Sequence, residues 1–456
     1  MMLSDWMAEE RVAARLTAAG IRENCGALAA SCFVQAATEL TRRCIKPDEP
    51  VLGLWVPGRI EVLGKHTDYC GGQSLLAAVE RGFSMLAAPA SGRMLQMIDA
   101  RQNESCEFPL DEHLQPQIGR WSNYPQTVAR RVARNFPHAS RGSTIAFVSN
   151  LPASSGMSSS SALIVGTFLA LADVNDLARD ETYRRSIRNR EDLAGYLATM
   201  ENGMSFGPFD GDAGVGTFGG SEDHTAILNC QSDTLSLYSY CPLRFRRSVT
   251  IDDRYVLAIA SSGVIAEKTG DAREKYNRIS ALAAEIVRLW TRATNQPVTS
   301  LTGIINSAPD AEDRLRHTLK DASPSEFTIQ ELTERLDHLV IENGFVASVP
   351  DRLDADKINE FGALALQSHR AAAQLLKNQT PETNRLVDLA MQLGAHGASA
   401  FGAGFGGSVW AIIDSDASAR FLTDWQRQYE NESPEAAARA TFFVTRPGPP
   451  AITWSN

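Results

Sequence analysis

Residues Ser143-Thr-Ile-Ala-Phe-Val148, followed by Ser149-Asn-Leu-Pro-Ala-Ser-Ser-Gly-Met-Ser-Ser-Ser-Ser-Ala-Leu163, combine an apolar run with a loop of small residues. The apolar run predicts a strand, and an apolar helix is predicted to begin near Ser159. Small residues let the backbone wrap around an anion, and a helix N-terminus favours negative charge. The segment therefore predicts a phosphate-binding loop, although a Ser-rich loop can also be a flexible linker. It is not a Walker A loop, because the pattern G-x-x-x-x-G-K-[ST] does not occur in the sequence.

A second polar loop follows the short apolar strand predicted at 60–63, within Pro57-Gly-Arg-Ile-Glu-Val-Leu-Gly-Lys-His-Thr-Asp-Tyr-Cys-Gly-Gly72. Its cluster of polar side chains can hydrogen-bond a polyhydroxylated ligand, and its glycines permit tight turns and close backbone approach. The same composition also fits a polar turn without function. A third loop, Gly397-Ala-Ser-Ala-Phe-Gly-Ala-Gly-Phe-Gly-Gly-Ser-Val-Trp410, is Gly-rich and leads into a strand, which by itself is a weak signal.

The rest of the chain mixes helical and strand patterns. Helical spacing over 8–45 predicts two helices that break near Gly20 and Gly26. Further segments are assigned by the same reasoning. Strands are predicted at 51–56, 84–88, 95–98, 255–260, 409–413 and 441–444, a hairpin at 227–230 and 235–238, and helices at 271–294, 327–342, 355–377 and 382–393. The polar segment 307–326 is predicted to be a mobile insertion. Without strict βαβ alternation, the pattern favours an α+β fold in two lobes, 1–240 and 241–456.

Composition limits the classes of partner. The 456 residues are 43% hydrophobic and 21% charged, with a net charge of -10. An acidic chain disfavours nucleic acid, although a local pocket can still bind ATP. The longest apolar-rich run, 162–174, is too short to span a bilayer, and the first residues lack a secretory signal pattern. We expect a cytoplasmic protein, monomeric or weakly dimeric, that binds no nucleic acid or membrane.

The three loops together resemble the motifs of one kinase family. Pro57–Gly72 resembles the galactokinase signature P-G-R-[VI]-N-L-[IL]-G-E-H-T-D-Y-N-G-G, and Leu151–Leu163 resembles the GHMP phosphate loop L-P-x-G-x-G-L-S-S-S-A. Phe401–Ser408 is similar to the third motif, T-G-[AG]-G-F-G-G-C. The resemblance to the GHMP superfamily, closest to galactokinases, implies a two-lobed α+β fold with ATP and sugar between the lobes. It also implies transfer of the ATP γ-phosphoryl group to a monosaccharide hydroxyl, that of C1 in galactose or a close relative.

The resemblance also implies roles for individual residues. Asp223, from the segment matching G-[IV]-M-D-Q, is the expected base, and Arg59 its neighbour. A carboxylate can accept the hydroxyl proton, while a guanidinium keeps it ionised and offsets phosphoryl charge. Mg²⁺ is expected on Ser160 and Glu201. The sugar contacts are Lys65, His66, Asp68 and Tyr69. The phosphate contacts are Ser154, Ser155, Gly156, Met157, Ser158, Ser159, Ser160, Gly404 and Gly406.

Several positions depart from the family pattern. Lys65 replaces a Glu that faces C6 of the sugar, and Ser161 stands at the Ala of the phosphate loop. Glu222 and His224 stand where the family has Met and Gln, and a sugar-packing Tyr is aligned loosely with Ala272. The chain also carries about ten extra residues within 203–218, which could form a lid or reshape the sugar pocket.

Two alternatives follow from these departures. A buried Lys65 needs a partner, either an internal acid such as Glu61 or the carboxylate of a uronic acid. The second option predicts a galacturonate or glucuronate kinase. A non-catalytic sensor of sugar and ATP is the other alternative, which the presence of Arg59, Asp223 and Ser160 disfavours.

Overall fold

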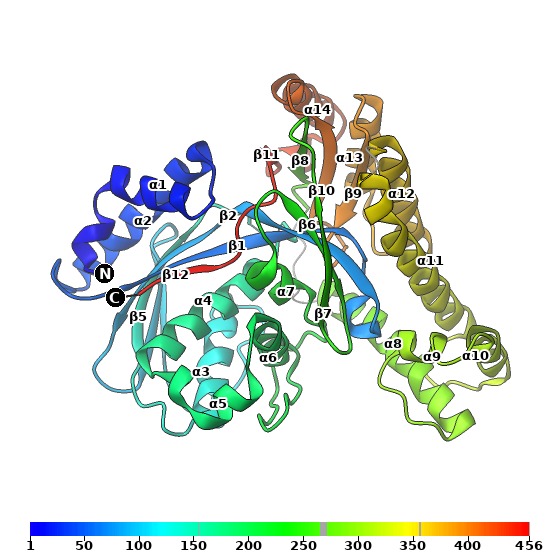
Figure 1. Ribbon diagram of the computed structural model, residues 1–456, viewed down its shortest axis with the longest axis horizontal. Coiled ribbons are helices and arrows are strands. Elements are labelled where there is room, and N and C mark those ends of the chain that lie inside the picture. Colours follow the sequence, from blue (N-terminus) through cyan, green and yellow to red (C-terminus); the bar gives the residue numbers. More distant parts are fainter. Residues whose placement is uncertain (154, 265–270, 355–356, 456) are drawn as a thin grey trace.

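The computed structural model describes residues 1–153, 155–264, 271–354 and 357–455 of the chain. Within this part the fold is α+β, as the sequence predicts, with one sheet of eight strands and one of four (Figure 1). The strands of the larger sheet are β1 (Leu52–Leu63), β2 (Gln73–Pro89), β3 (Met94–Asp99), β4 (Glu104–Pro109), β5 (Ser143–Ser149), β6 (Thr234–Ser239), β7 (Arg244–Thr250) and β12 (Ile452–Trp454). Those of the smaller sheet are β8 (Tyr255–Ser261), β9 (Gly397–Phe401), β10 (Ser408–Asp414) and β11 (Thr441–Thr445).

The helices fall into two groups by their order along the chain. The first group consists of α1 (Glu9–Ala18), α2 (Glu23–Arg42), α3 (Asn123–Asn135), α4 (Ser159–Val174), α5 (Glu181–Ser186), α6 (Arg190–Asn202) and α7 (Glu222–Asn229). The second group consists of α8 (Asp271–Thr294), α9 (Leu301–Ile305), α10 (Ala311–Asp321), α11 (Ile329–Asp354), α12 (Ile358–Ala371), α13 (Pro381–Gln392), α14 (Ser418–Glu432) and α15 (Pro434–Ala437). Among the described residues no helix combines the length and apolar character needed to cross a bilayer.

The larger sheet is built around the long antiparallel pair β1 and β2. Its strand order is β12-β1-β2-β5-β3-β4. In addition, β6 pairs with the first residues of β2, and β7 pairs with β6. The helices α1 and α2 cover one face, where Phe33 of α2 packs with Trp6 and Trp55. The helices α3, α4 and α6 cover the other face (Figure 1). Because β7 and β12 belong to this sheet, both ends of the segment 241–456 pair with strands of the first half.

The smaller sheet has the order β11-β8-β10-β9 and is antiparallel throughout. Alternate residues of its strands face opposite sides, as the pleat requires. Leu257 and Ile259 of β8 join the core shared with the larger sheet, whereas Val256 and Ala258 pack under α13 and α14. The two lobes are therefore joined by a continuous apolar core, not by a linker alone.

Three sequence predictions for secondary structure are wrong. Residues 227–230, predicted as a strand, lie in α7 and at its end, because a four-residue apolar run does not distinguish a strand from a buried helix. The first helical break comes at 19–22, and Gly26 lies inside α2. Most of the polar segment 307–326 forms α10, whose Leu315 and Leu319 are buried. The predicted helix at 355–377 is α12 followed by a π-helical turn at Ala372–Leu376, and its residues 355–356 lie outside the described part.

The helices α8 to α11 form a separate apolar cluster that contacts the sugar loop. Trp290, Leu315 and Leu336 are among its buried members, and Cys70 and Tyr69 of the polar loop pack against it. The helices of this cluster contain most of residues 300–350, to which the sequence assigns no role. The cluster packs against the loop that follows β1 through Tyr69 and Cys70.

Candidate active site

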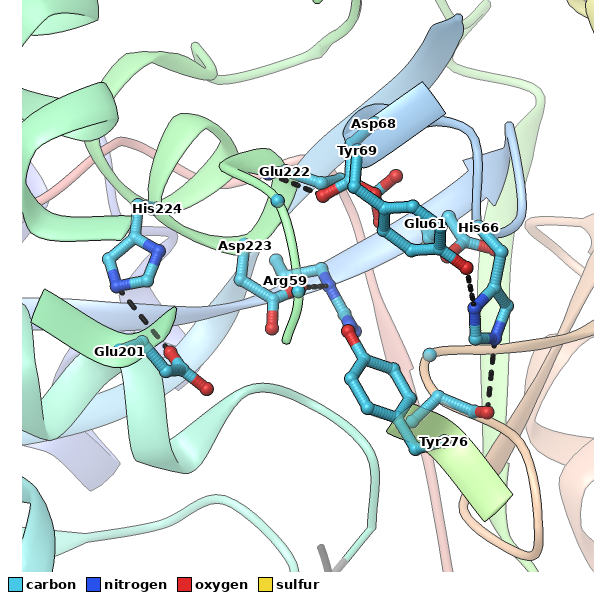
Figure 2. Close-up of a pocket in the computed structure, with 14 residues that line it drawn as sticks. Arg59, Glu61, His66, Asp68, Tyr69, Glu201, Glu222, Asp223, His224 and Tyr276 are labelled. Carbon is cyan, nitrogen blue, oxygen red and sulfur yellow. Dashed lines mark hydrogen bonds and ion pairs between the residues drawn. The ribbon is translucent and has the colours of Figure 1, made fainter. Parts of the chain in front are cut away.

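Two adjoining pockets lie where the end of β1, the start of α7 and the start of α4 meet. The first is here called the acidic pocket (Figure 2). It is lined by Arg59, Glu61, His66, Asp68, Tyr69, Glu201, Gly219, Gly220, Glu222, Asp223, His224, Tyr276, Gly402 and Ala403. The second, the phosphate-loop pocket, is lined in part by residues 155–160. Arg59 and Ala403 line both pockets.

The buried guanidinium of Arg59 joins the two pockets. Its Nε donates to Asp223 Oδ1 at 2.7 Å (Figure 2), and its Nη1 donates to the carbonyl oxygen of Gly156 at 2.6 Å. Burial acts to lower the pKa of Arg59, but the carboxylates of Asp223, Glu222 and Glu61 raise it above its ordinary value. One fixed cation therefore holds a carboxylate beside the phosphate loop.

Asp223 lies in the first turn of α7, where the helix dipole favours a carboxylate. Its side chain remains partly exposed, at 16%. The hydroxyl of Ser161 lies 3.4 Å from Asp223 Oδ2 and donates at 2.8 Å to Glu201 Oε2. Ser161 thus connects the expected base to the expected metal ligand, a role that the sequence analysis did not assign.

Glu201 belongs to the last turn of α6 and is buried. His224 Nε2 lies 3.6 Å from Glu201 Oε2 (Figure 2). Glu201 lines the acidic pocket, and Ser160 lines the neighbouring phosphate-loop pocket. A carboxylate and a hydroxyl are hard oxygen donors of the kind that Mg²⁺ prefers, so the two residues fit that ion.

The polar loop after β1 is held rigidly at the mouth of the acidic pocket. His66 adopts a positive φ of 55°. Its Nε2 lies 3.1 Å from the carbonyl oxygen of Ala403, which can only accept, and its Nδ1 lies 2.9 Å from the Tyr69 hydroxyl (Figure 2). Asn378 Nδ2 also lies 3.2 Å from His66 Nε2, so contacts at both ring nitrogens fix the position of the imidazole.

Asp68 is buried at the wall of the same pocket. Its Oδ2 accepts from the backbone N–H of Glu222 at 3.2 Å, and burial raises its pKa. Gly220 comes so close that a Cβ there would lie 2.4 Å from Asp68 Oδ2. Backbone hydrogen bonds from Tyr69 and from Asp68 itself also act on this carboxyl group and fix its orientation.

The phosphate loop is anchored through Ser155. Ser155 Oγ donates to Pro152 O at 2.8 Å, and the carbonyl of Ser155 accepts from Ser408 Oγ at 2.7 Å. Ser158 caps α4 with a positive φ of 60°, and its buried hydroxyl has no hydrogen-bond partner among the described residues. An orphaned hydroxyl beside the open N–H groups of a helix N-terminus suits a phosphate oxygen. Ser154, predicted to contact phosphate, lies outside the described residues.

The third loop contributes through residues other than the two glycines singled out from the sequence. Ala403 lines both pockets, and a Cβ on Gly402 would lie 2.8 Å from the carbonyl oxygen of Gly156. Gly404 packs instead against Asn378, whose carbonyl oxygen would lie 2.4 Å from an added Cβ. Gly404 and Gly406 lie outside the described lining of either pocket, so their contribution is to loop geometry.

Comparison with known proteins gives three family matches in the order of these loops. The galactokinase galactose-binding signature matches residues 48–89, the GHMP kinases N terminal domain matches 123–211, and the GHMP kinases C terminal domain matches 353–431. The chain is a galactokinase-like GHMP kinase. The resemblance predicted from the three loops is therefore confirmed.

Relatives and solved structures agree with this assignment. This GHMP kinase is 27% identical to the galactokinase of Chloroflexus aggregans over 80% of this chain and 85% of the relative. It is 26% identical to that of Fusobacterium nucleatum over 86% and 92%. Its fold matches Lactococcus lactis galactokinase complexed with galactose, with a TM-score of 0.75, 22% identity and coverage of 92% and 99%. The mevalonate kinase of Methanococcus jannaschii matches with a TM-score of 0.53 at 14% identity, covering 88% and 99%.

In this GHMP kinase Lys65 points away from the sugar loop. Its Nζ donates to Ser368 Oγ at 3.0 Å, and Ser368 Oγ in turn donates to Glu342 Oε1 at 2.9 Å. The side chain is 1% exposed and lies outside the described lining of the acidic pocket. The geometry therefore gives no support to a substrate carboxylate as the partner of Lys65.

Two buried glutamates that the sequence analysis did not assign to the site face the acidic pocket. Glu222 Oε2 accepts from Ser74 Oγ at 2.6 Å, and the Glu61 and Glu222 carboxyl groups share a hydrogen bond. Burial raises the pKa of Glu61 to about 7, and burial together with Glu61 raises that of Glu222 well above its ordinary value. The signal was visible in the motifs, because Glu61 replaces the Asn of the galactokinase signature and Glu222 replaces a Met.

An aromatic side chain from outside the sugar loop also lines the acidic pocket, Tyr276 of α8, four residues beyond Ala272, where the loose alignment placed the missing Tyr. Its ring lies 5.5 Å from that of His66 and lines the acidic pocket. The phosphate-loop pocket also has aromatic walls that the sequence analysis missed, Trp121 and Tyr124.

The extra residues 203–218 form part of the wall of the phosphate-loop pocket. Asp212 accepts from Arg130 Nε at 2.7 Å and Arg131 Nη1 at 3.3 Å, and both arginines are buried. Val215 and Thr217 then line the phosphate-loop pocket. This buried anchoring argues against a mobile lid. It gives no support to a reshaped sugar pocket either, because residues 203–218 are absent from the described lining of the acidic pocket.

Proposed function

We propose that this chain is an ATP-dependent sugar kinase that transfers the γ-phosphoryl group to the C1 hydroxyl of galactose or a close relative. The observation that carries the proposal is the position of Arg59. It lines both pockets while paired with Asp223 on one side and with the carbonyl of Gly156 on the other. The arrangement brings a candidate base next to a phosphate-binding loop, which is what phosphoryl transfer to a hydroxyl requires.

In this proposal the acidic pocket binds the sugar. Asp68 and His66 are held in place by backbone contacts and can hydrogen-bond hydroxyl groups, with Tyr276 packing beside them. Asp223 accepts the proton of the attacking hydroxyl through its partly exposed carboxylate. Arg59 fixes the carboxylate orientation toward the phosphate loop and offsets the negative charge that develops on the transferred group.

The phosphate-loop pocket binds ATP. Residues 155–160 would cradle the phosphates with backbone N–H groups and the Ser158 hydroxyl, and Trp121 and Tyr124 provide flat surfaces for a base. Ser160 and Glu201 would hold Mg²⁺ together with phosphate oxygens, and the bound ion would neutralise phosphate charge. The division of the chain into two lobes, residues 1–240 and 241–456, is also part of this proposal.

The test is a coupled ADP-release assay with Mg-ATP and a panel of galactose, glucose, galacturonate, glucuronate, arabinose and fucose. Phosphorus NMR of the product identifies the phosphorylated carbon. We expect turnover of galactose or a close relative, a C1 phosphate, and loss of turnover in Asp223→Asn. Asp416→Asn is the matched control, because Asp416 is exposed.

The same assay decides between the alternatives. A non-catalytic sensor would bind sugar and ATP without releasing ADP in either the wild type or Asp223→Asn. A uronate kinase would turn over galacturonate or glucuronate faster than galactose, and its rate would depend on Lys65.

A further inference from the structure

The acidic pocket is lined by more carboxyl groups than a neutral sugar requires. Five carboxyl side chains line it. Arg59 is the one guanidinium or ammonium side chain among its described lining residues, and Asp223 already pairs with it. The lining carboxyl groups are Glu61, Asp68, Glu201, Glu222 and Asp223. Burying several carboxylates without counter-charges is unfavourable, so this excess needs a reason.

Glu61 supplies a second and independent observation. The residue is 3% exposed, lines the pocket, and its Oε1 has no hydrogen-bond partner among the described residues. The neighbouring cation Lys65 directs its Nζ to Ser368 instead. A buried carboxyl side chain that lines a ligand pocket and has an oxygen without a donor indicates that a donor comes from the ligand.

We infer that the pocket binds a monosaccharide bearing a protonated amino group, and that this ammonium group pairs with the carboxylates of Glu61 and Glu222. This inference rests on the proposed sugar kinase activity and defines its substrate class. An ammonium group carries three donors and no acceptor, so it matches side chains that can only accept. It also provides the positive charge that the pocket lacks.

The protonation of the glutamate pair agrees with this assignment. The pKa of Glu61 is raised to about 7 and that of Glu222 is raised well above its ordinary value, so the pair holds a proton when no cation is bound. A substrate ammonium would take the place of that proton. A metal ion is the less suitable occupant, because no three His, Cys, Asp or Glu side chains within the described residues are grouped to hold one.

The experiment compares kcat/KM for galactose with that for the 2-amino, 4-amino and 6-amino deoxy derivatives of galactose, at about pH 6.5 where amines are protonated. N-acetylgalactosamine is the neutral control. We expect one amino sugar to exceed galactose by at least about tenfold, and this ratio to fall about tenfold in Glu61→Gln and in Glu222→Gln. Glu10→Gln, at an exposed position, should leave the ratio unchanged.

The possible outcomes separate this inference from the proposed activity. Turnover of galactose with no better amino sugar, or a ratio unaltered in both glutamine variants, overturns the inference and leaves the kinase standing. If no sugar is phosphorylated, the proposed activity fails, and calorimetric affinities for galactose and the amino sugars decide the inference in the same way. A rise in melting temperature with K⁺ or Mg²⁺ alone, lost in Glu61→Gln, would assign the pair to a metal ion and overturn it.

Discussion

Arg59 Nε lies 2.7 Å from Asp223 Oδ1, and this ion pair joins β1 to the first turn of α7 across 164 residues of chain. The guanidinium is buried while the carboxylate keeps 16% of its surface exposed toward the pocket. A carboxylate held in this way is oriented without being enclosed, which suits a group that must accept a proton from a bound ligand.

The first prediction concerns Asp223. Asp223→Asn retains the shape of the side chain but cannot accept the hydroxyl proton, so kcat should fall by about 10²–10⁴-fold. KM for sugar should change little, because the neighbouring Asp68 and His66 remain in place. Steady-state kinetics measures both values, with Asp416→Asn as the control. A variant that keeps kcat within about threefold of the wild type would show that Asp223 is not the base.

The second prediction concerns the hydroxyl that links two carboxylates. Ser161→Ala removes the 2.8 Å hydrogen bond to the buried Glu201. The loss of a hydrogen bond to a charged group should lower the free energy of unfolding by about 1.5–3 kcal/mol, as measured by urea denaturation. The control Ser31→Ala removes an exposed hydroxyl that bonds the carbonyl of Leu28, and should change stability by less than about 0.5 kcal/mol.

The third prediction uses two glycines with the same backbone angle. Gly404 and Gly92 both have a φ of 84°, but a Cβ on Gly404 would lie 2.4 Å from the carbonyl oxygen of Asn378, whereas none of the described atoms lies within 4 Å of one on Gly92. Gly92→Ala should therefore lower the free energy of unfolding only by the cost of placing alanine in the left-handed conformation, about 1–2 kcal/mol. Gly404→Ala should lower it clearly more. It should also raise KM for ATP, since Ala403 beside it lines both pockets. Equal losses of stability in the two variants would contradict the contact with Asn378.

The fourth prediction concerns the pH dependence of stability. The folded protein raises the pKa of Glu61 from 4.5 to about 7 and that of Glu222 well above 4.5, so the folded state binds more protons than the unfolded state. Stability from this pair is fully present below about pH 4.5 and is lost as the pH rises through about 7. The charged groups that act on the pair are Arg59, Lys65, Asp68, Asp223 and Glu342.

Glu61→Gln tests this dependence because glutamine does not titrate. At pH 8 the variant should melt higher than the wild type, by an amount on the order of 2 °C, and near pH 5 the difference should shrink. Melting curves across this range measure the effect, and Glu10→Gln provides the exposed control. A difference that grows toward pH 5 would have the wrong sign and would reject the raised pKa of the pair.

Most of the pocket residues that the motifs assigned could be predicted because they lie on short loops after strands. Arg59 lies in β1, and His66 and Asp68 lie in the loop that follows it. All three line the acidic pocket. Residues 155–160 likewise follow β5 and line the phosphate-loop pocket. Local patterns suffice for such segments, since the strand end and the helix start place the loop between them. Their chemical roles remain predictions for the experiments above.

The residues that were missed come from elements whose relative position depends on packing. Tyr276 reaches the pocket only because α8 packs beside the sugar loop, and Trp121 because the segment before α3 borders the phosphate loop. The sequence predicts a strand at Ile227 and Leu228, because so short an apolar run shows neither a helical nor a strand periodicity. In the structure both residues lie in α7 and are buried in the core.

The sequence by itself determined the family, the α+β class and the three ligand loops, because each depends on residue types at short spacing. Only the tertiary structure decided which way Lys65 points and that Glu61 meets Glu222. The direction of Lys65 is set by Glu342 of α11 and Ser368 of α12, and the glutamate pair forms where α7 packs on β1. A side chain finds its partner through the packing of distant elements, and spacing along the chain does not encode that distance.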